Sequence, residues 1–426
     1  MRILIKNGIV LDMSTNEPNA EVKDILIQDD KIIKIEKDIQ EDVNKIIDAE
    51  GKAVIPGLVN CHNHSAMSLF RGYSDDVELM EWLNNKIWPV EDKLTKEHIY
   101  YGSLLSCIEM IKSGTTIFND MYWFMEETAK AATKAGIRAV VGRCIINGNL
   151  DQRIKEAKEL YENYNNTSDG TILVNVAAHA PYTCNPETLK ECVKLAKNLN
   201  TSIHIHLSET QDEQNQIKEK YGKTPTEYLE ENGVFEVPTI LAHGIHLSDS
   251  DLSILKKHDA KIVHNPISNL KLASGIADIV KYRKLCFDVG IGTDGAGSTN
   301  TLDMFEEMRV AAYMQKVSHK KSSCINAYDV LKMATIEGAK VLNLDNQIGT
   351  IEVGKKADIV IVDLNKPHMQ PLNDVCSALV YSSIGQDVCY TIVNGKIVME
   401  NRKIVGLDEN EVIEKCNKIL KELGMK

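Results

Sequence analysis

Long hydrophobic runs are missing from this sequence, which contains no stretch of about 18 uncharged apolar residues, the length that a transmembrane helix requires. The opening segment MRILIKNGIVLDM has only short apolar runs, interrupted by Lys6 and Asp12, and so differs from a cleavable secretion signal. The ten cysteines include no C-x-x-C pair, and we expect them to be reduced thiols. These absences predict a cytoplasmic protein without a membrane partner.

Positive charge is also scarce. The chain has 49 Lys and Arg against 61 Asp and Glu, a formal net charge of −12, and only eight of its residues are Arg. Such an acidic chain disfavours nonspecific binding to nucleic acid or to an anionic membrane surface. The lack of C-x-x-C also excludes the zinc deaminases that act on nucleic acids, whose signature joins H-x-E to P-C-x-x-C. We therefore expect no nucleic acid partner.

The sequence shows two different residue patterns, each in its own part of the chain. Short runs rich in Ile and Val occupy residues 1–55 and return in residues 346–426, and we expect them to form one small β-sandwich, with a helix at the end of the chain. In residues 56–345, eight short apolar runs end in polar or histidine residues and alternate with helix-like segments. This alternation predicts an α/β protein, a (β/α)8 TIM-like barrel with a small β-sandwich built from both chain ends.

Histidines gather where these predicted strands end. Six of the twelve histidines lie at or just beyond the carboxyl end of a predicted barrel strand: His62, His64, His179, His206, His243 and His264. That rim of a (β/α)8 barrel builds the active site, whereas the opposite rim serves stability. A single buried histidine is commonly a core residue, but packing alone does not explain six on one rim. The pattern indicates a site that uses imidazole groups.

Four of the residues on this rim suit a single metal ion. His62 and His64 have i, i+2 spacing, so both side chains are expected to point into the barrel mouth. His206 ends the fifth strand, and Asp294 ends the eighth strand, which is next to the first strand in a closed barrel. Three imidazoles and a carboxylate can hold a divalent cation. Glu209 suits a proton shuttle, although a solvated loop carboxylate is the alternative.

His204 shares a strand face with His206 but is further from the strand end. We therefore assign the metal ligand to His206 and interpret His204 as a core histidine with a backbone partner.

At this point the motifs resemble a known group of proteins, the amidohydrolase superfamily. Within it they most resemble the 5′-methylthioadenosine/S-adenosylhomocysteine deaminases, which include the 5′-deoxyadenosine deaminases of methanogens. The motifs are PGLVNCHNH at 56–64, HAPYT at 179–183, HIHLSET at 204–210, AHG at 242–244, HNP at 264–266, SNLKLASGI at 268–276 and GTDG at 292–295. The resemblance runs over nearly the whole chain.

The resemblance implies hydrolytic deamination at C6 of adenosine-type nucleosides to the inosine analogue and ammonia. It implies one divalent metal per subunit, zinc with iron as the alternative, held by the four residues named above. Relatives with two metals carry a lysine at the end of the fourth strand, which ends here in VNVAAHA. The implied catalytic residues are Glu209, His243 and Asp294. Hydroxide on the metal attacks C6, Glu209 carries a proton to N1, and His243 orients the attacking water. Glu209 and Asp294 also contact the substrate.

Further substrate contacts follow from the same resemblance. Glu91 matches a glutamate that binds the ribose hydroxyls, His179 matches a histidine that contacts the nucleoside, and Ser298 lies near the purine edge. Arg143 and Arg153 match arginines that hold the carboxylate of a homocysteine group, one of them from a neighbouring subunit. A homo-oligomer, such as a tetramer, is therefore implied. Surface ion pairing is the alternative for both arginines.

Two other functions compete with this interpretation. The first is another hydrolase on the same scaffold, which would deaminate guanine or cytosine or open an imidazolone-type ring; Glu91 and Arg143 argue against it. The second is a scaffold protein without activity. The chain has the complete set of metal-ligating and catalytic residues, which argues against this alternative.

Overall fold

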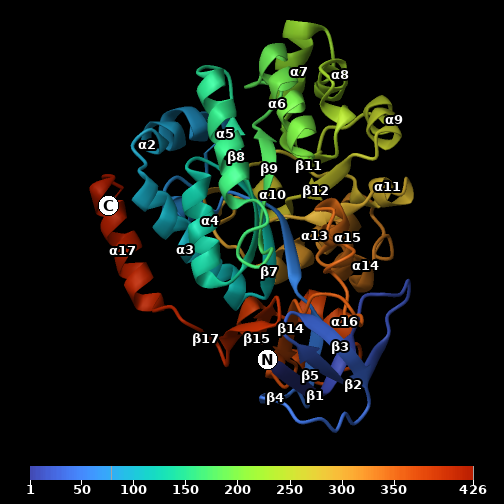
Figure 1. Cartoon of the computed structure of the whole chain (residues 1–426). Helices are drawn as coiled ribbons and strands as arrows, with labels where there is room; N and C mark the ends of the chain where they lie inside the picture. Colours follow the sequence, from blue (N-terminus) through green and yellow to red (C-terminus); the bar gives the residue numbers. More distant parts are fainter. Residues whose placement is uncertain (78, 426) are drawn as a thin grey trace.

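The computed structural model describes residues 1–77 and 79–425, whose strands form two sheets. One is a parallel sheet of eight strands that curves into a barrel, and the other is a mixed sheet of nine strands drawn from both ends of the chain. Figure 1 shows the second sheet below the barrel and helices around the barrel. The predicted fold class is therefore confirmed. None of the described helices combines the length and apolarity of a membrane span.

The eight predicted runs are the eight barrel strands, in the same order. They are β6 (Leu58–Asn63), β7 (Thr115–Tyr122), β8 (Arg138–Ile145), β9 (Ile172–Ala178), β10 (Ile203–Leu207), β11 (Thr239–His243), β12 (Lys261–His264) and β13 (Val289–Ile291). Each strand pairs in parallel with the next. The last strand returns to the first where Asp294 N donates to His62 O at 3.0 Å. Residues from the first and eighth strands therefore meet at one point of the rim.

Helices follow the barrel strands and cover the outside of the barrel (Figure 1). Those of nine residues or more are α3 (Lys96–Lys112), α4 (Met125–Ala135), α5 (Leu150–Tyr164), α6 (Pro186–Leu199), α7 (Gln211–Tyr221), α9 (Asp249–Lys257), α13 (Met304–Ser318) and α17 (Glu409–Glu422). Short ones include α1 (Leu79–Trp82), α2 (Trp88–Glu91), α8 (Pro225–Glu231), α10 (Pro266–Lys271), α11 (Ile279–Lys284), α12 (Ala296–Thr299), α14 (Ala327–Met333), α15 (Ile336–Val341) and α16 (Val375–Ser377). Side-chain caps start several of them: Asn185 accepts from Thr188 N before α6, and Ser248 accepts from Asp251 N before α9.

The two ends of the chain share the second sheet. Its strands are β1 (Arg2–Leu11), β2 (Ala20–Gln28), β3 (Lys31–Glu36), β4 (Lys45–Asp48), β5 (Lys52–Pro56), β14 (Ile359–Asp363), β15 (Val388–Val393), β16 (Lys396–Glu400) and β17 (Lys403–Ile404). The ends join where β5 pairs with β14. A bridge between Lys31 and Lys356 brings the edge strand β3 back toward β14, so the sheet curls around a core of isoleucines and valines. The N-terminal part supplies five of the nine strands, which pair with one another, and the C-terminal part extends this sheet with four more.

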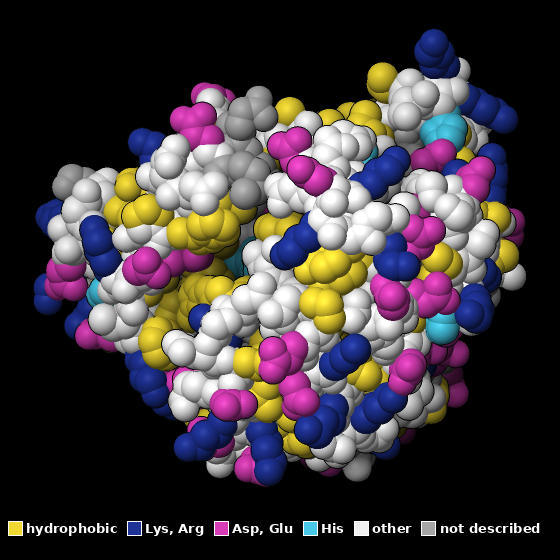
Figure 2. All heavy atoms as spheres, turned by 90° about the horizontal axis from the view of Figure 1, so that it is seen from above, with side chains coloured by type: hydrophobic (Ala, Val, Ile, Leu, Met, Phe, Trp, Pro, Cys, Tyr) yellow, Lys and Arg dark blue, Asp and Glu magenta, His cyan; other side chains and the backbone are white. Residues whose placement is uncertain are grey.

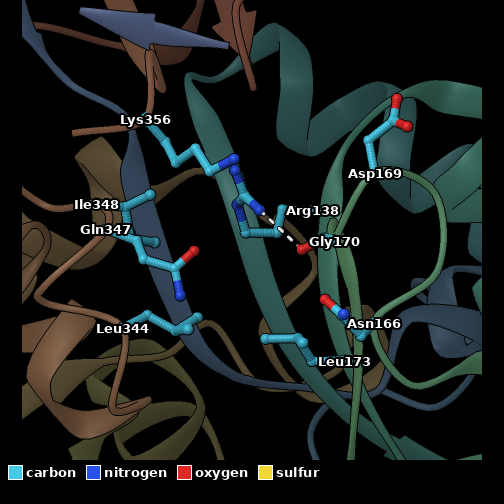
Figure 3. A pocket seen from close by; sticks show the side chains of 9 residues that line it. All are labelled: Arg138, Asn166, Asp169, Gly170, Leu173, Leu344, Gln347, Ile348 and Lys356. Carbon is cyan, nitrogen blue, oxygen red and sulfur yellow. Dashed lines mark hydrogen bonds between the residues drawn. The ribbon is translucent and has the colours of Figure 1, made fainter. Parts of the chain in front are cut away.

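A buried ion pair ties the barrel to this sheet. Arg138, the first residue of β8, donates from Nε and Nη2 to the two carboxylate oxygens of Asp358, each at 3.0 Å. Both side chains are almost fully buried. Figure 3 shows Arg138 in a cavity of about 400 Å³ at this end of the barrel, where its guanidinium also donates to Gly170 O. A bidentate pair of this kind fixes the relative position of the two sheets.

Replacing Asp358 with alanine should lower the free energy of unfolding by about 3–5 kcal/mol, because Arg138 would remain buried without its partner. Urea unfolding measures this change. Asp169→Ala is the matched control, since the Asp169–Lys396 pair is 71% exposed on both sides and should contribute less than about 1 kcal/mol. Equal effects from the two variants would contradict the structural role of the buried pair.

Candidate metal centre and active site

A cavity opens at the rim of the barrel that lies opposite the second sheet. Figure 2 shows a hollow on this face with hydrophobic side chains around it and histidine at its base. The described residues that line the cavity are His64, Met67, Trp82, Leu83, Glu91, Met121, Tyr122, Trp123, Cys144, His179, Tyr182, His206, Glu209, His243, Leu272, Asp294 and Ser298. None of these described lining residues is Lys or Arg, and three are acidic. The cavity thus combines apolar walls with negative charge.

A bulge in β6 brings His62 and His64 to the cavity side. Asn60 pairs with Phe118 and Asn63 with Asp120, so three steps along β6 match two steps along β7. The extra residue changes which way the following side chains point, as β-bulges do beside active sites. His62 is fully buried and His64 nearly so. His62 and His64, which are two residues apart in the sequence, therefore lie on a strand whose regular alternation the bulge interrupts.

Backbone carbonyl groups set the tautomers of two of the imidazoles. His64 Nδ1 lies 2.7 Å from Met121 O, and His206 Nδ1 lies 2.7 Å from His179 O. A carbonyl oxygen only accepts, so each Nδ1 must carry the proton and each Nε2 must present a lone pair. The two Nε2 atoms nevertheless face each other at 3.3 Å. Two lone pairs at this distance repel each other unless a proton or a metal ion lies between them, so the pair suits a metal site.

The remaining distances fit the same cation. Asp294 Oδ1 lies 3.4 Å from His62 Nε2 and 3.3 Å from His64 Nε2. Ligands about 2.0–2.1 Å from a tetrahedral metal are about 3.3–3.4 Å apart, so these separations suit ligands that share one metal ion. Among the described residues, two overlapping groups could hold such an ion: His62 with His64 and Asp294, and His62 with His206 and His243. His62 Nε2 is also buried without a hydrogen-bond partner. Burial lowers the pKa of His62 to about 4, which keeps it in the neutral form that binds metals.

The third imidazole, His62, contacts another histidine instead of a carbonyl. Its Nδ1 lies 2.9 Å from Nε2 of His204, and the side-chain amide of Asn119 lies 3.2 Å from Nδ1 of His204. His204 is fully buried below the cluster. It occupies the deep position expected from the sequence, but both of its nitrogens have side-chain neighbours.

Three residues of the site have left-handed backbone conformations. The φ angles are +53° at Ser208, +76° at His243 and +62° at Asp294. Residues other than glycine, asparagine and aspartate adopt this region rarely, at a cost of order 1–3 kcal/mol each, and such residues concentrate at functional sites. Of these three residues, His243 and Asp294 line the cavity, whereas Ser208 accepts a hydrogen bond from Gln214 in the turn that precedes Glu209.

Glu209 and His243 stand next to the cluster and face each other. His243 Nδ1 lies 2.8 Å from Asn269 Oδ1, so its Nε2 faces Glu209 Oε2 at 3.8 Å. Burial raises the pKa of Glu209, whereas for His243 the nearby carboxylates of Glu209 and Asp294 outweigh burial and raise its pKa. A carboxyl group with a raised pKa binds a proton more tightly than an ordinary glutamate does, which suits a group that transfers a proton to a bound molecule.

Glu213 is a residue that sequence reasoning missed. Thr210 and Glu213 have the spacing of a capping box, and Thr210 Oγ1 does accept from Glu213 N at 3.2 Å. The Glu213 carboxylate, however, accepts from the backbone N–H groups of Ser208 at 3.0 Å and Glu209 at 2.9 Å. The capping pattern was the signal in the sequence that could have pointed to Glu213. In the structure, the Glu213 carboxylate supports the turn that carries Glu209.

Glu91 and Tyr122 form one wall of the cavity. Glu91 ends α2 and accepts a hydrogen bond from the Tyr122 hydroxyl, and burial raises its pKa. Tyr122 is the last residue of β7, so its position at a strand end could have indicated a role. Trp82 and Trp123, which also line the cavity, gave no such signal.

His179 and Ser298 both lie on the cavity wall. His179 follows β9, and its Nδ1 lies 2.8 Å from Thr183 Oγ1. Ser298 lies on α12, with its hydroxyl 3.2 Å from Asp294 Oδ2. His264, in contrast, is buried behind the rim and does not line the cavity.

The two arginines lie outside the cavity lining. Arg143 points from β8 to Glu156, with Nε and Nη2 each 2.8 Å from the same carboxylate oxygen. Its guanidinium carbon is 4.9 Å from the centre of the Trp123 ring, and that of Arg153 is 5.4 Å from the same centre. Since Trp123 lines the cavity, both cations contact its wall, but neither reaches the inside.

Comparison with known proteins agrees with this site. Residues 53–398 match the amidohydrolase family. The 5-methylthioadenosine/S-adenosylhomocysteine deaminase of Caldanaerobacter subterraneus subsp. tengcongensis is 48% identical, with 98% of each chain covered. The 5′-deoxyadenosine deaminase of Methanosarcina acetivorans is 44% identical over 99% of this chain and 98% of its own.

Solved structures give the same result. An adenosine deaminase from Xanthomonas campestris with bound zinc superposes with a TM-score of 0.95, at 31% identity, over 100% of this chain and 99% of the other. The atrazine chlorohydrolase TrzN of Arthrobacter aurescens, at 22% identity and a TM-score of 0.92 over 98% and 100% of the two chains, shares the fold. The chain therefore belongs to the amidohydrolase family, whose members are metal-dependent hydrolases.

Proposed function

We propose that this protein is a cytoplasmic aminohydrolase that removes the C6 amino group of adenosine-type nucleosides as ammonia. The substrate class comprises 5′-deoxyadenosine, S-adenosylhomocysteine, 5′-methylthioadenosine and adenosine, in agreement with the names of its relatives. The observation that carries the proposal is the buried carboxyl of Glu209 beside the histidine–aspartate cluster, in a cavity that also holds Glu91.

One divalent metal per subunit would be held by His62, His64, His206 and Asp294. The three imidazoles and one carboxylate favour zinc, with iron as the alternative. When bound, such a metal lowers the pKa of a water ligand toward neutrality and so supplies a nucleophile at pH 7.

The residues around the cluster would manage the protons. Glu209, whose pKa burial raises, would deliver a proton to N1 of the purine and make C6 more electrophilic. His243 would orient the attacking water, since Asn269 fixes its ring with Nε2 toward the cavity. Asp294 would help transfer a proton to the departing amine.

Other lining residues would hold the nucleoside. Glu91 offers carboxylate oxygens to two vicinal hydroxyl groups of the ribose, with Tyr122 fixing its position. His179 and Ser298 would contact the nucleoside and the purine edge. Arg143 donates to Glu156, so it would bind a substrate carboxylate only after this contact breaks. Arg153, whose Nε donates to Gly148 O at 2.9 Å, would bind a substrate carboxylate across a subunit contact in a homo-oligomer.

A panel of substrates tests the proposal through kcat/KM. We expect turnover of adenosine and of the three analogues named above that differ from it at the 5′ position, and no turnover of guanine or cytosine. Adenosine 5′-monophosphate should have a kcat/KM at least about 100-fold lower than 5′-deoxyadenosine, because the described lining carries carboxylates and no cation. Turnover of guanine or cytosine without adenosine analogues would overturn the proposal in favour of another deaminase. A strong preference for adenosine alone would overturn the broad substrate class.

A further inference from the structure

The two carboxylate oxygens of Asp294 have different surroundings. Oδ1 accepts from Gly295 N at 2.8 Å and faces the Nε2 atoms of His62 and His64. Oδ2 points away from the imidazoles and accepts from the hydroxyl of Ser268 at 2.6 Å. Ser268 is fully buried and has no part in the chemistry described so far. The carboxylate is therefore held by its second oxygen.

A second hydroxyl connects this contact to the cavity. Ser298 Oγ lies 3.1 Å from Ser268 Oγ and 3.2 Å from Asp294 Oδ2. A serine hydroxyl has a single proton, and the short 2.6 Å contact assigns that of Ser268 to Asp294. Ser298 also has one proton, and Asp294 Oδ2, Ser268 Oγ and Gly295 O at 3.1 Å all lie within its reach, so Ser298 is a weaker donor to Asp294 than Ser268 is. The two serines come from α10 and α12, which follow different barrel strands.

A buried glutamate joins the two helices that carry these serines. Glu307, on α13, is fully buried, and burial raises its pKa well above the usual value. Its Oε2 accepts from Ile267 N at 3.1 Å, and its Oε1 accepts from Thr299 Oγ1 at 3.2 Å. Ile267 precedes Ser268 in the chain and Thr299 follows Ser298. One carboxyl group thus fixes the neighbours of both serines.

We propose that Ser268 and Glu307 are positioning residues that fix the orientation of Asp294 for metal binding. Ser268 holds Oδ2 and thereby presents Oδ1 alone to the metal, and Glu307 sets the spacing of α10 and α12 that brings Ser268 to Asp294. This inference rests on the proposed role of Asp294 as a metal ligand. It assigns a role to two buried polar residues that the proposed reaction does not use.

The physical reason is the freedom of an unsupported carboxylate. Without the short hydrogen bond from Ser268, Oδ2 keeps only the longer contact with Ser298. The carboxylate can then rotate more freely about its last torsion, which is broad, and present either oxygen or both to a cation. Partners of metal ligands remove this freedom, and their loss typically weakens metal affinity about 10–100-fold. Ser268 is fully buried, so water does not readily replace its hydroxyl.

The test measures zinc affinity by chelator competition on the metal-stripped full chain. Ser268→Ala removes the donor to Asp294, and Glu307→Met removes both contacts of Glu307 while keeping its volume. Glu307→Gln is the conservative variant, since its amide can still accept from Ile267 and contact Thr299. Ser383→Ala is the matched control, because Ser383 is equally buried and its hydroxyl contacts Met369.

We expect Ser268→Ala to raise the zinc dissociation constant about 10–100-fold and Glu307→Met about 10-fold. Glu307→Gln and Ser383→Ala should stay within about twofold of the unmodified chain. Because Glu307 acts through Ser268, the double variant should bind zinc no more weakly than Ser268→Ala. If Glu307→Met does not fold, Thr299→Val removes one of the same contacts and should also weaken zinc binding.

Zinc affinity of Ser268→Ala within twofold of the unmodified chain would overturn the proposal for both residues. Additive losses in the double variant would overturn the part concerning Glu307. The proposed deamination stands or falls separately, since the substrate panel measures turnover and this experiment uses zinc alone. A chain that binds zinc in the expected order but turns over no adenosine analogue would refute the proposed function and keep this inference.

Discussion

Glu209→Gln is expected to lower kcat for 5′-deoxyadenosine by about 10²–10⁴-fold and to leave metal content unchanged. The amide cannot carry the proton to N1, and general acid–base catalysis contributes an effect of this size. Steady-state kinetics together with elemental analysis of the purified variant measure both quantities. Because Glu209 lies 3.8 Å from His243 and outside the four proposed ligands, the metal should remain.

Glu219→Gln is the control for this variant, since Glu219 is an exposed glutamate on α7, the helix that follows Glu209. Its kcat should match that of the unmodified protein. A Glu209→Gln enzyme with near-normal kcat would remove Glu209 from the proton-transfer role.

His64→Ala is expected to abolish both metal binding and turnover. The variant loses the imidazole whose Nε2 lies 3.3 Å from both Asp294 Oδ1 and His206 Nε2. Loss of a ligand should weaken metal affinity by more than the roughly 10–100-fold that loss of a ligand's hydrogen-bond partner costs. Prolonged treatment of the unmodified protein with a chelator should give the same inactive state, and added zinc should restore activity.

His319→Ala is the control, because His319 is a partly exposed histidine that pairs with Asp278 away from the cavity. It should keep its metal and its activity. An active His64→Ala enzyme, or a purified protein that binds no divalent metal, would refute the metal centre.

The sequence predicts the barrel well because each strand is a short apolar run that ends at a chemically distinctive residue. The runs ending near His62, His206 and Asp294 are strands β6, β10 and β13, and closing the barrel brings their ends together. Parallel topology alone therefore predicts which rim carries the site.

The parts that could not be predicted depend on local geometry. The i, i+2 spacing of His62 and His64 does not reveal the bulge between Asn60 and Asn63. The sequence also cannot tell that Arg143 points to Glu156, since either face of a strand end is compatible with its position. Such contacts are set by tertiary packing, which has no short-range signal.

Ser268 and Glu307 illustrate a second reason. Each is an ordinary residue by type and spacing, and its importance lies in two hydrogen bonds to residues distant in the sequence. A buried carboxyl on α13 becomes notable only when its partners on α10 and α12 are known.

The left-handed turns at Ser208, His243 and Asp294 bear on any effort to make this protein more heat-resistant. Glycine adopts these backbone angles at little cost, so glycine variants would relax the chain at each position. At His243 and Asp294, however, the same substitution deletes a side chain that the proposed reaction uses. Selection for thermal stability alone would therefore favour glycine at positions where it abolishes activity. Of these three residues, only Ser208 could become glycine without losing a side chain that the proposed reaction uses.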